Sequence, residues 1–272
     1  MLVQAEGSSH WYDRQGKPQY SRPNKAKPGQ MRDTNLRDAR KENLLPSVTT
    51  ITKIIARPQL EAWKIEQGIL ASLTLPRADN ETDDDFARRV VQDARSVSRD
   101  AADLGTEFHH YSALYDTLGV RPTDDGKTIM DPRMPQMVAG YILWHQKHLG
   151  GVTHTEQCFA AHGYGGRDDL LATTIDGRTV LIDKKTKATR QGKRIEVYDE
   201  QGMQLAACAN GLKLDKDALL WNVFVSTTEM GRCEVHDWTE QRDRYWQMFQ
   251  TALSLWCQIK KYDPRKAVED AE

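Results

Sequence analysis

A short apolar stretch, Thr179-Val180-Leu181-Ile182, constrains the fold of this chain more than any other feature. Its near-continuous hydrophobic character is typical of a strand that is covered on both faces. The charged residues Asp183, Lys184 and Lys185 follow it directly. Charges at the end of a buried strand are costly unless they are paired or coordinate a metal ion. We therefore expect an α/β fold with a central buried strand and a functional site where that strand ends.

The residues before this strand predict a hairpin, and the length of its turn decides which residue faces Asp183. A two-residue turn at Asp176-Gly177 sets Leu170 opposite Asp183. A three-residue loop at 175–177, closed by a glycine in the left-handed conformation, sets Asp169 opposite Asp183 instead. Geometry alone favours the three-residue loop and leaves the two-residue turn open.

Two interpretations of the charged residues compete. In the first, Asp168, Asp169, Asp183 and Lys185 form an ordinary exposed charge ladder on a sheet with one solvated face. In the second, two carboxylates and an ammonium on adjacent strands hold a divalent metal ion and orient a water molecule against a phosphodiester. The apolar run before Asp183 disfavours the exposed ladder, so the pattern indicates nuclease chemistry.

Composition removes some classes of protein and leaves others open. The 38 lysines and arginines balance 39 acidic residues, and a net charge of −1 means that any contact with nucleic acid must come from local clusters. The four cysteines lie far apart without a Cys-x-x-Cys pair, so we expect reduced thiols and no zinc or iron–sulfur site. No apolar run approaches the roughly 18 residues of a membrane span, and Met1–Gln4 lacks signal-peptide character. We expect a soluble, cytoplasmic protein that has no membrane partner.

The chain divides into four predicted regions. Residues 1–44 are polar and rich in proline and glycine, which predicts an extended arm, solvated or draped over the body. Residues 45–150 predict a helical region, 151–262 a core domain and 263–272 a tail. Helices are predicted from Ser47 toward Ala56, from Pro58 through Ile65, and over 84–118, 137–149, 199–211 and 239–261. Strands are predicted over 153–161, 163–174, 179–186, 218–226 and 232–237.

Four blocks of sequence carry a resemblance to a known family. In chain order they are Leu45-Pro46-Ser47-Val48-Thr49-Thr50-Ile51, Gly105-Thr106-Glu107-Phe108-His109, Gly166-x-x-Asp169-Leu170 with Asp183-x-Lys185-Thr186, and Gln204-Leu205. Together they resemble the PD-(D/E)XK nuclease superfamily, specifically its RecB-like exonuclease branch. Within that branch the chain is most similar to phage-encoded exonucleases and the mitochondrial genome maintenance exonuclease. The similarity spans roughly residues 44 to 211.

The resemblance implies a fold and a set of site residues. The fold is a restriction-endonuclease-like core, a central mixed sheet flanked by helices, with an N-terminal helical region. Asp169 and Asp183 are expected to be catalytic metal ligands, and His109 a nitrogen ligand supplied by the helical region. Lys185 is expected to orient or deprotonate the attacking water, and Gln204 to position substrate near the lysine.

Two further groups are predicted to support the metal ion. The backbone carbonyl of Lys184 is one, and the carboxylate of Glu156, on the strand before the motif, is the weaker second. Oxygen ligands with one imidazole suit Mg²⁺ or Mn²⁺. The chain departs from the family pattern at Lys184, where an apolar residue is more usual, at Arg167-Asp168, and at Cys208.

The expected partner is DNA, bound at single- or double-stranded ends. A basic cluster follows the catalytic strand and predicts a phosphate-binding surface whose affinity depends steeply on salt, although a solvated loop explains it equally well. Its members are Lys187, Arg190, Lys193 and Arg194.

The predicted function is a metal-dependent DNA exonuclease of phage recombination, replication or DNA degradation, with a recombination or replication protein as a separate partner chain. A structure- or sequence-specific endonuclease is the nearest alternative, and a catalytically silent DNA-binding module is a third. Polarity, strand preference, processivity and oligomeric state are not encoded in any pattern that we recognise.

Overall fold

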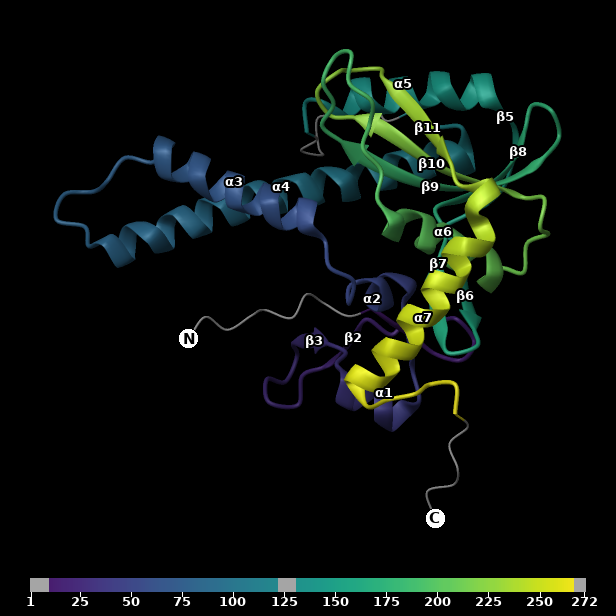
Figure 1. Cartoon of the computed structure of the whole chain (residues 1–272), viewed down its shortest axis with the longest axis horizontal. Coiled ribbons are helices and arrows are strands. Elements are labelled where there is room, and N and C mark those ends of the chain that lie inside the picture. Colours follow the sequence, from purple (N-terminus) through teal and green to yellow (C-terminus); the bar gives the residue numbers. More distant parts are fainter. Residues whose placement is uncertain (1–9, 122–130, 267–272) are drawn as a thin grey trace.

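The computed structural model describes residues 10–121 and 131–266 (Figure 1). Within them the chain is a mixed α/β protein with seven α-helices around a five-stranded sheet. The strand order is β11-β10-β9-β8-β5, and β9 pairs in parallel with β10 while the other neighbours are antiparallel. The strands of this sheet are β5 (Leu149–Thr155), β8 (Leu170–Thr174), β9 (Thr179–Lys187), β10 (Leu219–Ser226) and β11 (Cys233–Asp237).

Strand β9 is buried on both faces, as its apolar run predicts. Val180 and Ile182 join the cluster under α4 and α5, whereas Leu181 joins the cluster on the opposite face. There α6 lies on the sheet, supplying the crossover that a parallel β9–β10 pair requires, and α7 packs outside α6 (Figure 1). The helices are α4 (Asp83–Leu118), α5 (Met134–His148), α6 (Asp199–Gly211) and α7 (Arg242–Lys260), the last preceded by a 3-10 turn at Thr239–Gln241.

The hairpin between β8 and β9 has the three-residue loop. Gly177 adopts a φ of 87° and donates its amide hydrogen to the carbonyl of Thr174. Leu170 pairs with Ile182, so the next pair outward sets Asp169 opposite Asp183. The predicted register is therefore confirmed, and the two-residue alternative is wrong.

The predicted strands 153–161 and 163–174 are each interrupted, which corrects the sequence interpretation. The parts far from the hairpin turn at 162–163, called the outer strands, are β5 and β8 of the main sheet. The parts next to that turn, called the inner strands, form a separate two-stranded sheet. The interruption comes at Glu156, whose φ of 54° is incompatible with an extended strand. The inner strands are β6 (Cys158–Ala161) and β7 (Tyr164–Arg167).

The inner and outer ladders nevertheless keep one register. Thr155 pairs with Leu170 and Cys158 pairs with Arg167, so the four strands form one long bent hairpin. The two residues on each side of the bend are Glu156 and Gln157, opposite Asp169 and Asp168. A bend of this kind takes acidic side chains off the regular faces of a sheet.

The N-terminal segment is folded over residues 10–44 and packs on the body, so of the two predicted forms the arm takes the draped one and not the extended, solvated one. Trp11 is only 1% exposed and its ring centroid lies 6.1 Å from that of Trp256 on α7. This anchor outweighs the polar composition around it, because burying a large aromatic ring offsets the cost of ordering a short segment. The elements are β1 (Trp11–Tyr12), β2 (Ser21–Pro23), β3 (Met31–Asp33), α1 (Leu36–Glu42) and β4 (Leu45–Pro46).

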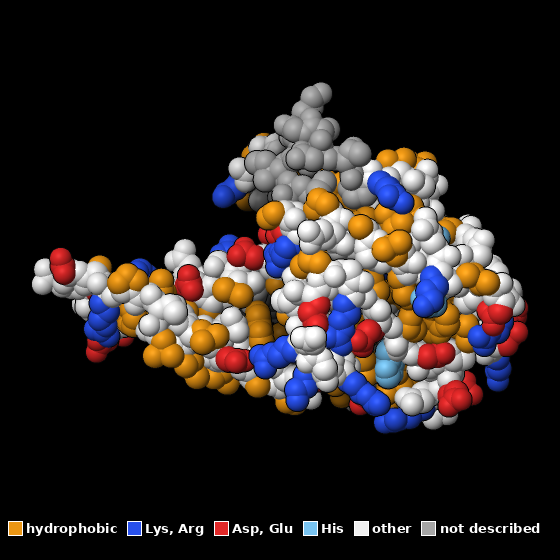
Figure 2. Space-filling model, turned by 90° about the horizontal axis from the view of Figure 1, so that it is seen from above, with side chains coloured by type: hydrophobic (Ala, Val, Ile, Leu, Met, Phe, Trp, Pro, Cys, Tyr) orange, Lys and Arg blue, Asp and Glu red, His pale blue; other side chains and the backbone are white. Residues whose placement is uncertain are grey.

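The helices that follow begin where their capping residues predict. Ser47 caps α2 (Val48–Thr52), Pro58 begins α3 (Pro58–Thr74), and Thr82 caps α4. Helix α3 and the first half of α4 form an antiparallel arm that projects from the sheet (Figures 1 and 2), with exposed apolar side chains along it. Of the predicted tail 263–272, only residues up to 266 lie within the described structure.

Two predictions drawn from composition are answered directly. All four cysteines are free thiols, with Cys208 and Cys257 buried and the other two half-buried. None of the helices in the described part of the chain has the length and apolar character needed to cross a membrane.

A buried ion pair joins α4 to the central strand. The ammonium of Lys184 lies 2.8 Å from Oδ2 of Asp116, and both side chains are 0% exposed. The hydroxyl of Tyr141 on α5 donates to the other oxygen of Asp116 at 2.9 Å. Lys184 thus points to the opposite face from Asp183 and Lys185, which explains how a cation replaces an apolar residue at this position.

Replacing Lys184 by methionine should lower the free energy of unfolding by about 3–5 kcal/mol, because Asp116 is left as an uncompensated buried charge. Adding Asp116→Asn should restore much of the loss, since the amide is neutral and still accepts from Tyr141. Urea unfolding followed by circular dichroism measures both. As a control, exposed Lys147→Met should change stability by less than about 0.5 kcal/mol. Purely additive losses in the double variant would contradict the pairing.

Candidate metal centre

Three acids and an amide lie in a row across the sheet. Asp183 pairs with Asn222 on the parallel neighbour β10. Asp169 lies one residue before Leu170, which pairs with Ile182, so an extension of that ladder brings it opposite Asp183. The amide of Glu156 donates to the carbonyl of Asp169 at 3.4 Å, just outside the ladder of β5 and β8. Residues directly opposite on neighbouring strands share a face and have closely spaced side chains, which applies to Asp183 and Asn222. Glu156 stands at the bend, outside the regular faces, and approaches Asp169 from there. The row stands where β8 begins and where the apolar part of β9 ends, so its charges lie at the margin of the core.

Helix α4 adds an imidazole to this row. Nδ1 of His109 lies 3.5 Å from Oδ2 of Asp169. One ligand atom each from His109, Glu156 and Asp169 lies within 4.8 Å of the others, a spacing that a single cation can bridge. The donor set of one imidazole and two carboxylates suits Mn²⁺ or Mg²⁺. Two of the predicted ligands are thus brought together with Glu156, which the sequence had placed only as a weaker candidate.

Asp183 is not part of the group formed by His109, Glu156 and Asp169. Its carboxylate is held by a separate hydrogen-bond network. The ammonium of Lys185 lies 2.8 Å from the carboxylate, and Nε2 of Gln204 on α6 donates to Oδ1 at 2.8 Å. Nδ2 of Asn222 donates to Oδ2 at 2.5 Å, and Asn222 in turn accepts from Trp238 Nε1 at 2.7 Å. The predicted catalytic residues Asp183, Lys185 and Gln204 therefore form one connected unit.

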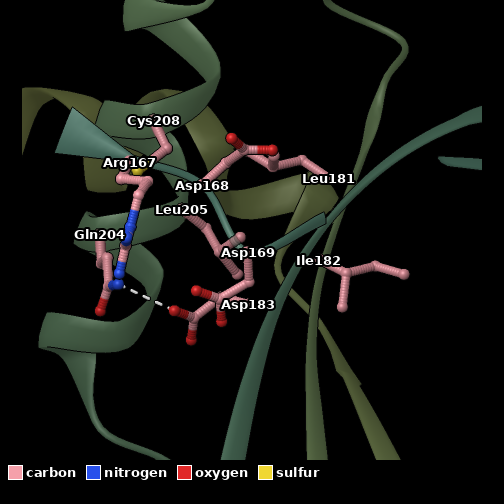
Figure 3. A pocket seen from close by; sticks show the side chains of 9 residues that line it. All are labelled: Arg167, Asp168, Asp169, Leu181, Ile182, Asp183, Gln204, Leu205 and Cys208. Atoms are coloured by element: carbon pink, nitrogen blue, oxygen red, sulfur yellow. Dashed lines mark hydrogen bonds between the residues drawn. The ribbon is translucent and has the colours of Figure 1, made fainter. Parts of the chain in front are cut away.

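A small pocket opens beside this unit (Figure 3). Asp169 and Asp183 both line it, and Gln204 reaches Asp183 from α6 (Figure 3). Its accessible volume is about 10 Å³, room for roughly one water-sized group. The pocket therefore has room for a single ion or water molecule next to the Asp169 and Asp183 carboxylates that line it.

Burial controls the electrostatics of the site. Burial raises the pKa of the Asp183 carboxyl, with Lys185 opposing the shift, and burial also raises the pKa of Glu156, where Arg167 opposes it. Burial alone would lower the pKa of Lys185, but Asp183 and Asp169 together raise it above its usual value. Crowded, partly buried carboxylates favour either protonation or a bound cation.

The backbone of Lys184 takes part through its amide nitrogen. That N–H donates to Oδ2 of Asp169 at 2.7 Å and so ties the acid to β9. Metal coordination by the Lys184 carbonyl stays a prediction.

The basic segment after β9 is held in place by hydrogen bonds from Arg232 to its backbone. The guanidinium of Arg232 donates to the carbonyls of Arg190 and Lys193 at 3.2 and 2.7 Å. Arg190, Lys193 and Arg194 expose their side chains, whereas the ammonium of Lys187 lies 2.6 Å from the Glu196 carbonyl. Three of the four predicted DNA contacts are thus accessible, and Lys187 braces the loop.

Asn222 and Asp116 are two further residues of the site that were not predicted from the sequence. Asn222 is a lone amide within the apolar run of β10, a pattern that signals a buried polar partner. Asp116 stands seven residues after His109, two helical turns along the same face of α4. The lone amide of Asn222 in an apolar run could be recognised from the sequence alone. The role of Asp116 could not, because it depends on Lys184 facing α4.

Comparison with known proteins adds little to this geometry. No model of a protein family and no curated protein matches the sequence. Among solved structures, the chain is similar to one described as "Crystal structure of SSO0001", with 10% identity over 71% of this chain and 86% of that chain, and a TM-score of 0.28. A likeness at that level carries no argument about fold or function.

Asp168, next to the row, is a buried acid without hydrogen bonds to its carboxylate. It is 3% exposed, and neither oxygen has a hydrogen-bond partner although Nδ1 of His154 lies 3.2 Å from Oδ2. Burial, with Asp169 adding to the effect, raises the pKa of Asp168 to about 7. Because the folded-state pKa exceeds the unfolded one, the folded protein loses stability as pH rises from about 4 to about 7.

Asp168→Asn should therefore stabilise the metal-free protein by about 2–4 kcal/mol at pH 8, with the gain shrinking toward zero near pH 4. Urea unfolding in EDTA at a series of pH values measures this. Asp176→Asn, at the exposed turn of the same hairpin, is the matched control and should show no such gain. Identical pH profiles for Asp168→Asn and the parent would contradict the assignment.

Proposed function

We propose that this chain is a Mg²⁺- or Mn²⁺-dependent deoxyribonuclease of the PD-(D/E)XK superfamily, and that it acts as a DNA exonuclease. One observation carries the proposal: ligand atoms of His109, Glu156 and Asp169 lie within 4.8 Å of one another, and Asp183 with Lys185 stands on the strand next to Asp169. The RecB-like resemblance selects His109, Asp169, Asp183 and Lys185 among these residues, whereas Glu156 lies outside its matched blocks. A role in phage recombination, replication or DNA degradation rests on that resemblance alone.

The donor set supports a metal ion held by His109, Asp169 and Glu156. Asp169 belongs both to this group and to the lining of the pocket that Asp183 shares. When bound there, the ion would supply charge stabilisation for the phosphate in the transition state. The acids alone are crowded and partly buried, so a cation relieves their repulsion.

Lys185 has two roles in the proposal. In the metal-free chain it compensates the charge of Asp183, at 2.8 Å. With a cation bound to the carboxylates, the amine of Lys185 would be available to orient the attacking water and to offset charge on the phosphate. Gln204 lies 3.4 Å from the same amine through Oε1 and fixes its direction.

The exposed basic loop supports DNA as the substrate. Arg190, Lys193 and Arg194 are exposed on the segment that follows β9, the strand that carries Asp183 and Lys185, and a cluster of this kind would bind a phosphate backbone. The same core serves endonucleases in this superfamily, so an endonuclease is the nearest alternative. A catalytically silent DNA-binding module is the third possibility, and the intact unit of Asp183, Lys185 and Gln204 disfavours it.

Incubation with end-labelled linear and closed circular DNA, with and without Mn²⁺, tests the proposal. We expect metal-dependent loss of the linear form only, because an exonuclease needs an end. Asp183→Asn and Lys185→Met should each slow cleavage by at least about 100-fold. Asn222→Ala, which frees Asp183 on one side, should slow it by about 10- to 100-fold.

Asp176→Asn on the distal turn is the control acid and should cleave at the parent rate. Thermal unfolding of each variant shows whether the fold is kept. Nicking of circular DNA would make the chain an endonuclease. Absence of digestion in both substrates, or a parent-like rate for Asp183→Asn, would end the proposal.

A further inference from the structure

A stacked pair of aromatic rings lies on the N-terminal segment. The ring centroids of His10 and Tyr20 are 4.5 Å apart, and the planes meet at 29°. His10 is exposed and Tyr20 is half-buried, so the pair presents an aromatic face to solvent. Neither ring belongs to the core clusters or to the proposed catalytic unit. Exposed aromatic rings of this kind are typical contact points for flat ligands.

The pair is held in place by the folded body. The amide of His10 donates to Oγ1 of Thr50 at 3.2 Å, and its carbonyl accepts from the amide of Ser47 at 2.9 Å. The hydroxyl of Tyr20 shares a hydrogen bond of 2.6 Å with the hydroxyl of buried Tyr12. A surface that is ordered in advance loses little conformational entropy when a ligand binds.

A chain of contacts through Tyr12 and β7 connects the rings with Glu156. Tyr12 packs on Gly165 of β7 so closely that an added Cβ would lie 2.8 Å from the Tyr12 side chain. Two residues further along the same strand, Nε of Arg167 lies 2.8 Å from the Glu156 carboxylate. Burial raises the pKa of Tyr20 and the charge of Arg167 opposes the shift, as expected for neighbours. The sequence of contacts thus leads from the ring pair to the proposed metal ligands.

The combination matches one kind of ligand. An aromatic face binds a nucleobase by stacking, and the half-exposed guanidinium of Arg167 is suited to the phosphate attached to that base. Bases inside a duplex are stacked on each other and offer no free face, whereas bases of a single strand do. The contacts run from the rings through the Arg167 cation to Glu156, an order that suits a strand whose end lies at the acids.

We propose that His10 and Tyr20 form a stacking subsite for an unpaired base of single-stranded DNA beside the catalytic row. The proposal rests on the proposed function for the identity of the polymer, and it adds the form of the substrate. It also gives the N-terminal segment a role in binding, which its polar composition does not indicate.

Equilibrium binding in EDTA tests the subsite without cleavage. Fluorescence anisotropy compares a labelled oligothymidylate with an abasic deoxyribose-phosphate oligomer of equal length at one salt concentration. The full chain should bind the thymidylate at least about fivefold more tightly, since stacking of one base contributes about 1–3 kcal/mol. His10→Ala and Tyr20→Leu should each reduce that preference.

His162→Ala is the matched control, because this exposed histidine lies in the turn at the far end of the β6–β7 hairpin and should keep the parent preference. His10→Ala changes an exposed side chain, so it tests the subsite even if Tyr20→Leu folds poorly. Equal affinity of the parent for both oligomers would overturn the subsite. A base preference without any nuclease activity would support the subsite and overturn the proposed function. Cleavage without a base preference would support the proposed function and overturn the subsite.

Discussion

The pairing of Leu170 with Ile182 is the constraint on which the site depends. Because side chains alternate along a strand, a shift of one residue would send Asp169 to the other face and leave Asp183 without a partner acid. The glycine-closed loop at 175–177 sets this register. The parallel register of β10 then adds Asn222 on the far side of Asp183, and the long hairpin adds Glu156 on the near side of Asp169.

Two departures from regular structure bring the remaining groups to this row. The bend at Glu156 separates the outer from the inner hairpin and leaves its acids at a sheet margin, where a cation has access. The buried pair of Lys184 and Asp116 fastens α4 to the strand that carries Asp183. His109 stands two helical turns before Asp116, so the same contact that holds α4 also sets the position of its imidazole.

Much of the main sheet and of the site was predictable because the signals are local. The apolar run of β9, the caps Ser47 and Thr82, and the turn glycine each act within a few residues. The bend at Glu156 was not predictable, because nothing in the residue types around it indicates that a glutamate adopts the left-handed backbone conformation. The folded N-terminal segment was missed for a related reason: Trp11 finds its partners on α7, some 240 residues later, and no local pattern reports such a contact.

Diffraction from crystals soaked in Mn²⁺, recorded at a wavelength where manganese scatters anomalously, tests the central claim most directly. We predict one strong anomalous peak within coordination distance of the His109 imidazole and the Asp169 carboxylate, with Glu156 or Asp183 completing the set. The peak should vanish in crystals of Asp169→Asn. A fully occupied manganese site elsewhere, or density without any metal between these groups at millimolar Mn²⁺, would contradict the account.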